Sequence, residues 1–205
     1  MEKVKREFRS AAEWDEFITS GCCHLDKIAV INTLKNECIR ITRSVFHQIE
    51  VDGNSFVFVR VGAESAMQII VKDNATAIVQ RGKVIGKGES RIILYENSSA
   101  ELTNKATGWA FAESRIILRQ SSAAFLYGEA SADVREKAKV IVGEYGTAEC
   151  QDNSTAVDAG TTAQITAIGK GQEMPSIEKG SWLIKRKYIK QKKWAEKMAT
   201  SQWSL

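Results

Sequence analysis

The 205-residue chain has one proline, two histidines and no run of 18 consecutive apolar residues. A single proline excludes collagen-like and proline-rich architectures. Without a long apolar run, the sequence offers no candidate for a membrane-spanning helix. The charged N-terminus also lacks the apolar core of a secretory signal peptide. We therefore expect one cytoplasmic domain, with non-classical export or a virion location left open as alternatives.

Motifs of known enzyme chemistry are also missing. No glycine-rich phosphate loop, GxSxG nucleophile turn or HExxH metal motif occurs. The four cysteines form no CxxC pair, because Cys22 and Cys23 are adjacent while Cys38 and Cys150 are isolated. This spacing gives no support for a zinc ribbon or a thioredoxin-like site, so we expect buried or half-buried free thiols. The sequence predicts a protein that is not an enzyme and has no cofactor and no metal site.

The positive charge is concentrated at the C-terminus. The net charge is +4, yet from Glu178 onward eight basic residues stand against two acidic ones. Such a basic segment is typical either of a solvated face or of a site for nucleic acid, an anionic glycan or an acidic protein.

An internal repeat dominates the middle of the chain. Residues 89–94 (ESRIIL) recur unchanged at 113–118, 24 residues later. A finer period of eight residues lies within this repeat, and its first position is always small: Gly82, Ser90, Ser98, Ala106, Ser114, Ser122, Ala130, Ala138 and Gly146. The residues two and four positions later are all uncharged and mostly apolar. Since alternate residues of a strand share one face, each unit reads as a five-residue strand and a three-residue corner.

Strands of this kind bury their apolar face only when successive coils stack. Isoleucines recur every 24 residues at an outward position, which favours three strands per coil: Ile69, Ile93, Ile117, Ile141 and Ile165. A 16-residue coil would instead place Ile93 beside Trp109 and Phe125, which disfavours it. The sequence therefore predicts a mainly β fold, a right-handed three-sided β-helix. Its 24-residue coil would repeat four to five times along the chain.

Residues 66–171 resemble the β-solenoid repeat proteins through these small-x-small/Val-x-apolar units. That class includes enzymes, fibre stalks and scaffold modules, so the resemblance implies a fold and leaves function open. Residues 1–65 are expected to form an N-terminal cap, with a helix at about 11–19 that begins at a capping box. Residues 39–61 form either a hairpin or a first coil. Residues 172–205 are expected to form a basic, aromatic segment with a strand at 181–189 and a helical cap from about 190.

Three candidate surfaces follow from these patterns. The first is the isoleucine column, which a terminal helix or a second subunit is expected to cover. The second is a possible glycan face: Glu101, Trp109, Phe125, Asp133 and Glu149. There, Glu101 and Glu149 would lie two coils apart, near the spacing of inverting glycosidases, with Phe125 between them. The third is an anion-binding tail: Lys185, Arg186, Lys187, Lys190, Lys192 and Lys193.

The leading interpretation is a non-catalytic β-solenoid scaffold or protein-interaction module, with a protein partner or homo-oligomerisation. Carbohydrate binding or cleavage on an outer face is the first alternative. Nucleic-acid binding by the basic segment is the second, because its lysines alternate with aromatic residues that stack on bases.

Overall fold

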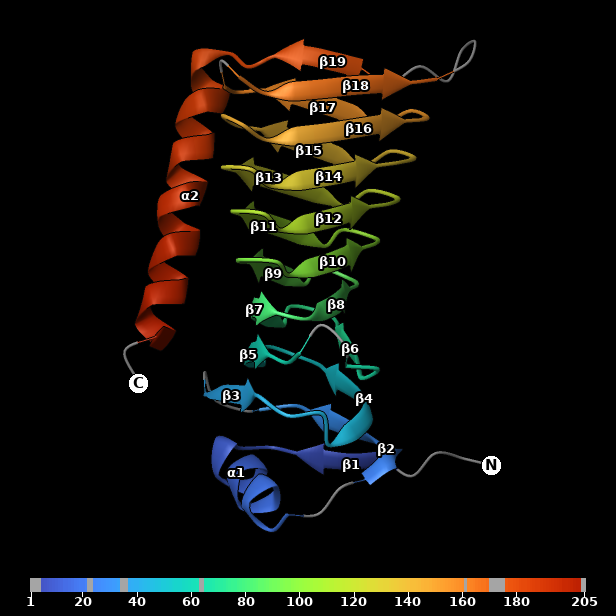
Figure 1. Cartoon of the computed structure of the whole chain (residues 1–205), viewed down its shortest axis with the longest axis vertical. Coiled ribbons are helices and arrows are strands. Elements are labelled where there is room, and N and C mark those ends of the chain that lie inside the picture. The colour runs from blue at the N-terminus through green and yellow to red at the C-terminus, as the bar shows by residue number, and fades with distance from the viewer. Residues whose placement is uncertain are drawn as a thin grey trace.

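The computed structural model describes residues 5–21, 24–33, 37–62, 65–160, 162–169 and 176–203. They form a parallel β-solenoid of two facing sheets with a short helix at one end and a long helix alongside (Figure 1). The predicted mainly β solenoid fold is confirmed.

The strands alternate between the two sheets along the chain. Sheet A has ten strands: β1 (Lys5–Phe8), β2 (His24–Ile31), β4 (Phe46–Val51), β6 (Gln68–Val71), β8 (Lys83–Gly86), β10 (Ser99–Leu102), β12 (Arg115–Leu118), β14 (Ser131–Val134), β16 (Thr147–Gln151) and β18 (Gln164–Ile168). Sheet B has nine: β3 (Cys38–Ile41), β5 (Phe56–Arg60), β7 (Thr76–Arg81), β9 (Arg91–Leu94), β11 (Thr107–Phe111), β13 (Ala123–Tyr127), β15 (Lys139–Val142), β17 (Thr155–Asp158) and β19 (Ser176–Lys179). The helices are α1 (Ala11–Thr19) and α2 (Trp182–Trp203).

Each coil of the repeat contains two strands, so the predicted three-sided, 24-residue coil is wrong. Ile93 of β9 pairs with Trp109 of β11, which pairs with Phe125 of β13, so each coil advances the chain by two eight-residue units. The chain makes about eight turns rather than four to five. An eight-residue unit is compatible with a coil of 16 residues and with one of 24. The mixed row of isoleucine and aromatic residues on the outer face of sheet B is not exposed to solvent, because α2 covers it. The predicted right-handed sense depended on a 24-residue coil, and the 16-residue coil does not support it.

The interior matches the predicted pattern of small and apolar positions. Ser90, Ile92 and Leu94 are fully buried, as are their counterparts Ser114, Ile116 and Leu118 in the other copy of the hexapeptide. Small residues are needed because the two sheets lie close together. At Gly108, an added Cβ would lie 2.9 Å from Leu102 Cδ1 and would also collide with Ile116.

The corners repeat as regularly as the strands. One residue in each has a left-handed backbone, with φ between 50° and 66°. From residue 88 to residue 136 these residues recur at intervals of eight, and Tyr145 and Asp152 continue the series with a shift of one residue at position 145: Gly88, Glu96, Asn104, Ala112, Gln120, Gly128 and Glu136. Along one edge, side chains link successive coils through backbone N–H groups. Asn104 N donates to Gln120 Oε1 (2.8 Å), Gln120 N to Glu136 Oε2 (3.0 Å) and Glu136 N to Asp152 Oδ2 (3.1 Å). These bonds hold the coils in register.

Helix α1 closes the N-terminal end, as predicted for a cap. It spans Ala11–Thr19, and Ser10 accepts a hydrogen bond from Glu13 N at its start. Trp14 and Phe17 are buried against Phe46, with ring centroids 6.0 and 5.2 Å from it. The aromatic cluster therefore replaces the coil that would otherwise cover this end of the core.

The strands before residue 66 belong to the same two sheets as the repeat. β4 pairs with β6 and β5 pairs with β7, all in parallel, so the sheets continue across the predicted boundary at residue 65. Of the two alternatives for residues 39–61, the hairpin is wrong and the solenoid coil is correct.

A group of charged residues crosses these first coils on sheet A. Glu50 is 7% exposed and accepts hydrogen bonds from Lys72 (2.9 Å) and Lys5 (3.2 Å). Burial by itself favours the neutral acid, but the two lysine hydrogen bonds outweigh it and lower the pKa of Glu50.

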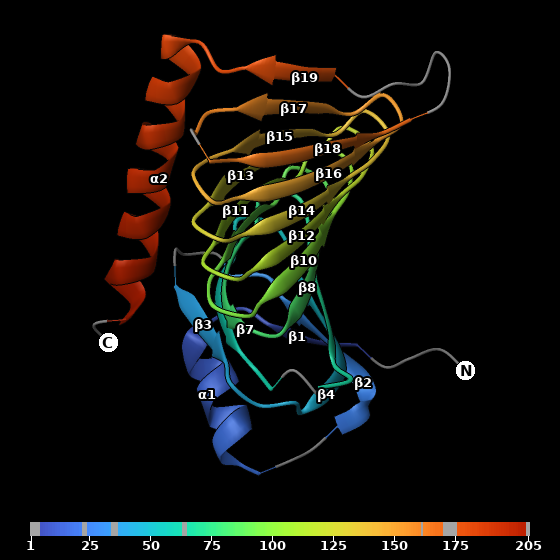
Figure 2. The ribbon, with the colours of Figure 1, turned by 45° about the horizontal axis from the view of Figure 1, so that its top comes forward.

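The C-terminal segment differs from the prediction. Residues 182–189, expected to form a strand, are the first part of α2. The helix does not cap the C-terminal end of the solenoid; it runs along sheet B, antiparallel to the direction in which the coils advance (Figures 1 and 2). The physical reason is that sheet B offers a continuous apolar outer face, against which one side of the helix packs.

Candidate functional site

The five isoleucines expected in one column lie on both sheets. Their 24-residue spacing is three units, so successive members alternate between sheet A and sheet B. Ile69 is buried in the core and Ile165 packs against it, while Ile117 lies half-buried on the outer face of sheet A. Only Ile93 and Ile141 share the outer face of sheet B. The predicted continuous stripe is therefore wrong.

Helix α2 covers the outer face of sheet B, including Ile93 and Ile141 of the predicted column. Beneath the helix, Tyr95, Phe111 and Tyr127 form a stack with centroid distances of 4.9 and 4.7 Å. Trp109 and Phe125 form a second, parallel row at 6.1 Å. Stacked coils place identical strand positions about 4.8 Å apart, which is why aromatic residues 16 apart in sequence stack so regularly.

Hydrogen bonds fix the position of α2 on this face. Tyr188 Oη donates to Leu126 O (2.6 Å), and Tyr127 Oη donates to Tyr188 O (3.1 Å). Trp109 Nε1 donates to Gln191 Oε1 (3.2 Å). Burial raises the pKa values of both tyrosines above their usual range, so both hydroxyls remain donors throughout the physiological pH range.

A glycine makes room for one of these contacts. Gly143 is buried opposite Tyr188, and a Cβ at this position would collide with the phenol of Tyr188. The glycine is required by the close approach of the helix, and its backbone φ is not in the left-handed region.

The six basic residues proposed as an anion-binding tail lie on α2, and all six are exposed. The helix as a whole carries seven basic residues and one acidic residue, Glu196, which lies 4.0 Å from Lys192. The aromatic residues expected to alternate with them differ in accessibility. Tyr188 is held against sheet B, Trp194 is half-buried, and the side chain of Trp182 lies outside the described part of the structure.

No described helix lies over the outer face of sheet A, which carries rows of polar residues. Glu101, Ile117, Asp133 and Glu149 follow one another in register on β10, β12, β14 and β16. Each carboxylate accepts a hydrogen bond: Glu101 from Arg119 Nε (2.8 Å), Asp133 from Arg135 Nε (2.9 Å) and Glu149 from Gln151 Nε2 (3.0 Å).

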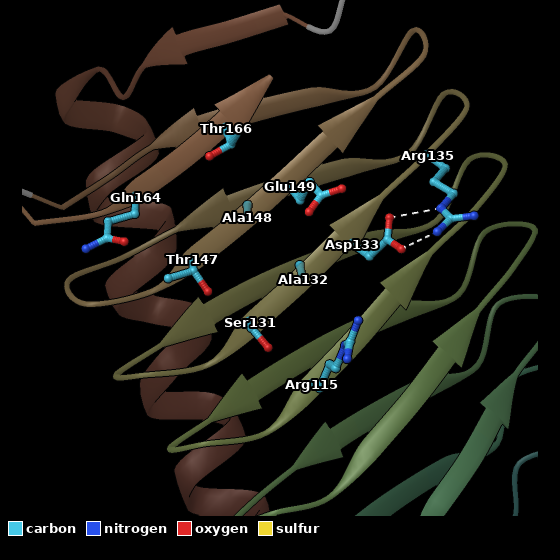
Figure 3. A pocket seen from close by; sticks show the side chains of 10 residues that line it. All are labelled: Arg115, Ser131, Ala132, Asp133, Arg135, Thr147, Ala148, Glu149, Gln164 and Thr166. Atoms are coloured by element: carbon cyan, nitrogen blue, oxygen red, sulfur yellow. Dashed lines mark hydrogen bonds and ion pairs between the residues drawn. The ribbon is translucent and has the colours of Figure 1, made fainter. Parts of the chain in front are cut away.

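A shallow depression of about 520 Å³ lies on this face (Figure 3). Its side chains point away from the sheet and include positive, negative and hydroxyl groups. They are Arg115, Ser131, Asp133, Arg135, Thr147, Glu149, Gln164 and Thr166, with the alanines 132 and 148 at the base.

The structure separates the residues of the predicted glycan face. Glu101, Asp133 and Glu149 lie on sheet A, whereas Trp109 and Phe125 lie on sheet B beneath α2, 5% and 7% exposed. Glu101 and Glu149 are three coils apart, about 14 Å by the strand spacing, rather than two. Phe125 does not lie between them. The predicted pairing of carboxylates around a sugar platform is wrong because it depended on the three-sided coil.

Sequence reasoning missed a groove between α2 and sheet B. It has a volume of about 500 Å³ and brings Arg91 and Thr107 of the sheet beside Lys187 and Trp194 of the helix. With a 16-residue coil, the spacing of Arg91, Thr107 and Trp109 would have indicated part of this surface. The pattern of the repeat did not indicate where the C-terminal helix would lie.

The cysteines that the structure describes are free thiols, as predicted. Cys150 is buried and Cys38 is half-buried, and burial raises the pKa of each thiol to about 11. Cys22 and Cys23 lie outside the described residues. In the part of the chain described, no cluster of histidine, cysteine or carboxylate side chains has the composition of a metal site, and no helix is long and apolar enough to cross a membrane.

Comparison with known proteins adds no family to this picture. No protein-family model, curated protein or solved structure matches the chain.

Proposed function

We propose that the chain is a non-catalytic β-solenoid interaction module that binds a partner protein through the outer face of sheet A. The observation that carries this proposal is the asymmetry of the two faces. Sheet B is covered by α2, whereas sheet A presents rows of side chains at successive strand positions. The stacked coils fix the backbone of these rows before a partner binds, which lowers the entropic cost of recognising another folded surface.

The composition of the sheet A face supports a protein partner over a polyanion. Asp133 and Glu149 lie among arginines and hydroxyl groups in the depression. Mixed charges of this kind match the complementary pattern of a protein surface, whereas the two carboxylates would repel phosphates. The hydrogen bonds that these carboxylates already make to neighbouring side chains favour a recognition role over acid–base catalysis.

Capture of partners from the native host with matched variants tests this proposal. Thr147→Arg places a bulky cation in the depression, and Thr155→Arg makes the same change at the equivalent strand position one unit later, on sheet B. We expect at least one protein to be retained by the wild type and by Thr155→Arg and lost with Thr147→Arg. Identical capture by all three proteins would contradict binding through sheet A.

We propose nucleic-acid binding by α2 as a second function, supported by a separate observation. Seven basic side chains, those of the predicted tail and Lys197, are exposed on a helix that is anchored to sheet B by hydrogen bonds. If six of the seven contact phosphates of a single strand, affinity should fall about 300-fold between 50 and 200 mM salt.

Fluorescence anisotropy with a labelled oligothymidylate measures this salt dependence. The triple variant Lys190→Ala/Lys193→Ala/Lys197→Ala should bind more weakly and with a smaller salt slope. Absence of binding by the wild type at 50 mM salt would refute the role of α2 in nucleic-acid binding.

A further inference from the structure

A groove runs between α2 and the outer face of sheet B, and we call it the α2 groove. Residues of β9, β11 and β13 line one side and residues of α2 line the other. Figure 1 shows the helix running alongside these strands. The residues that line the groove include Arg91, Thr107, Trp109, Phe125, Lys187 and Trp194.

Aromatic rings form the floor of the α2 groove. Trp109 and Phe125 lie nearly parallel, with 10° between their planes, and Trp194 leans over Trp109 with ring centroids 4.7 Å apart. Trp194 is half-buried, so part of its ring faces the groove. Such a surface favours a planar ligand that stacks on an indole.

Two cations stand toward opposite ends of this floor. Arg91 is on β9, whereas Lys187 precedes Tyr188, whose carbonyl accepts a hydrogen bond from Tyr127 of β13. β9 and β13 are two strand spacings apart, about 9.6 Å. Both cations are exposed and neither has an ion-pair partner among the described residues, and no acidic residue lines the groove.

We propose that the α2 groove binds one nucleotide of a single-stranded nucleic acid. The base stacks on Trp194, and Arg91 and Lys187 contact the phosphates on its two sides. A base within a strand has a phosphate on each side, which matches a cation toward each end of the floor, whereas a free mononucleotide has a phosphate on one side only. This inference rests on the proposed binding of nucleic acid by α2 and adds a base-stacking site to it.

Three probes of stated composition test the α2 groove: a ten-residue oligothymidylate, an abasic oligomer of the same length and charge, and thymidine monophosphate. We expect the oligothymidylate to bind at least tenfold more tightly than the abasic oligomer and to quench tryptophan fluorescence. We expect the monophosphate to bind more weakly than both oligomers, because it has one phosphate.

Matched variants connect this preference to the groove. Thr107→Glu places a negative charge in the α2 groove and should reduce the preference for bases to about twofold or less. Thr155→Glu makes the same change in the same row of sheet B, outside the groove, and should leave the preference unchanged. Arg91→Ala should weaken oligothymidylate binding, whereas Arg115→Ala, in the identical hexapeptide on sheet A, should not. Trp194→Leu keeps an apolar side chain and should remove the preference for bases.

The outcomes separate this inference from the broader role of α2. Equal, salt-dependent affinities for the oligothymidylate and the abasic oligomer would overturn the base-stacking site and leave phosphate binding by α2 intact. If neither oligomer binds at 50 mM salt, both the base-stacking site and the binding of nucleic acid by α2 are overturned. Binding of thymidine monophosphate as tight as that of the oligothymidylate would overturn the assignment to a strand in favour of a free nucleotide.

Discussion

Two identical hexapeptides, at 89–94 and 113–118, give a direct test of the number of strands per coil. Ile93 and Ile117 occupy the same position of this hexapeptide, but the structure places them on opposite sheets. Ile93 is 0% exposed beneath α2, whereas Ile117 is half-buried on the open face of sheet A between Glu101 and Asp133. Their replacement by alanine should therefore have unequal costs.

The magnitudes follow from burial. Ile93→Ala removes fully buried methyl groups and leaves a cavity beneath the helix, which should lower the free energy of unfolding by about 2 to 5 kcal/mol. Ile117→Ala removes atoms that are partly in contact with solvent and leaves no closed cavity, so its cost should be about 1 kcal/mol or less.

Urea unfolding followed by far-ultraviolet circular dichroism measures both values. Ile92→Ala and Ile116→Ala are the matched controls, because both side chains point into the core and are 0% exposed. These two controls should cost about the same. Equal costs at Ile93 and Ile117 would refute the two-sheet arrangement, since a three-sided coil would make these positions equivalent.

Three further predictions concern other contacts. Gly143→Ala should displace Tyr188 and cost about 2 to 4 kcal/mol from the lost hydrogen bond and ring packing, whereas Gly62→Ala, which has open space around it, should be nearly neutral in thermal unfolding. Glu50→Gln should cost about 1 to 2 kcal/mol at pH 7. Because folding lowers the pKa of Glu50, its contribution is present above the unfolded value near 4.5 and is lost as the pH falls through the folded value, so wild type and variant should converge in acid urea titrations. Burial raises the pKa of the Cys150 thiol to about 11, so this thiol should react with iodoacetamide at pH 8 only after unfolding. Mass spectrometry locates the label, and rapid labelling of Cys150 in the native protein would contradict its burial.

Local pattern was sufficient to predict the interior of the solenoid. The recurrence of small residues every eight positions identified which side chains point inward, because strand alternation acts within a single unit. The helix at 11–19 was equally local, since Ser10 and Glu13 specify its start and Gly21 follows its end with a φ of 71°.

Only the tertiary structure decided how many units close one coil and what lies outside them. The eight-residue unit is the same in a two-unit and in a three-unit coil. The recurring isoleucines favoured three units, because the sequence did not indicate that α2 would cover a mixed row of Ile93, Trp109 and Phe125. Residues 182–189 are the first part of α2, and Tyr188 among them packs on Tyr127, a contact between positions 61 apart in sequence. The alternation within a single strand determines which side chains point inward. What an outward side chain contacts depends instead on segments that are distant in sequence. The α2 groove is lined by outward residues of sheet B and by residues of α2 that lie against them.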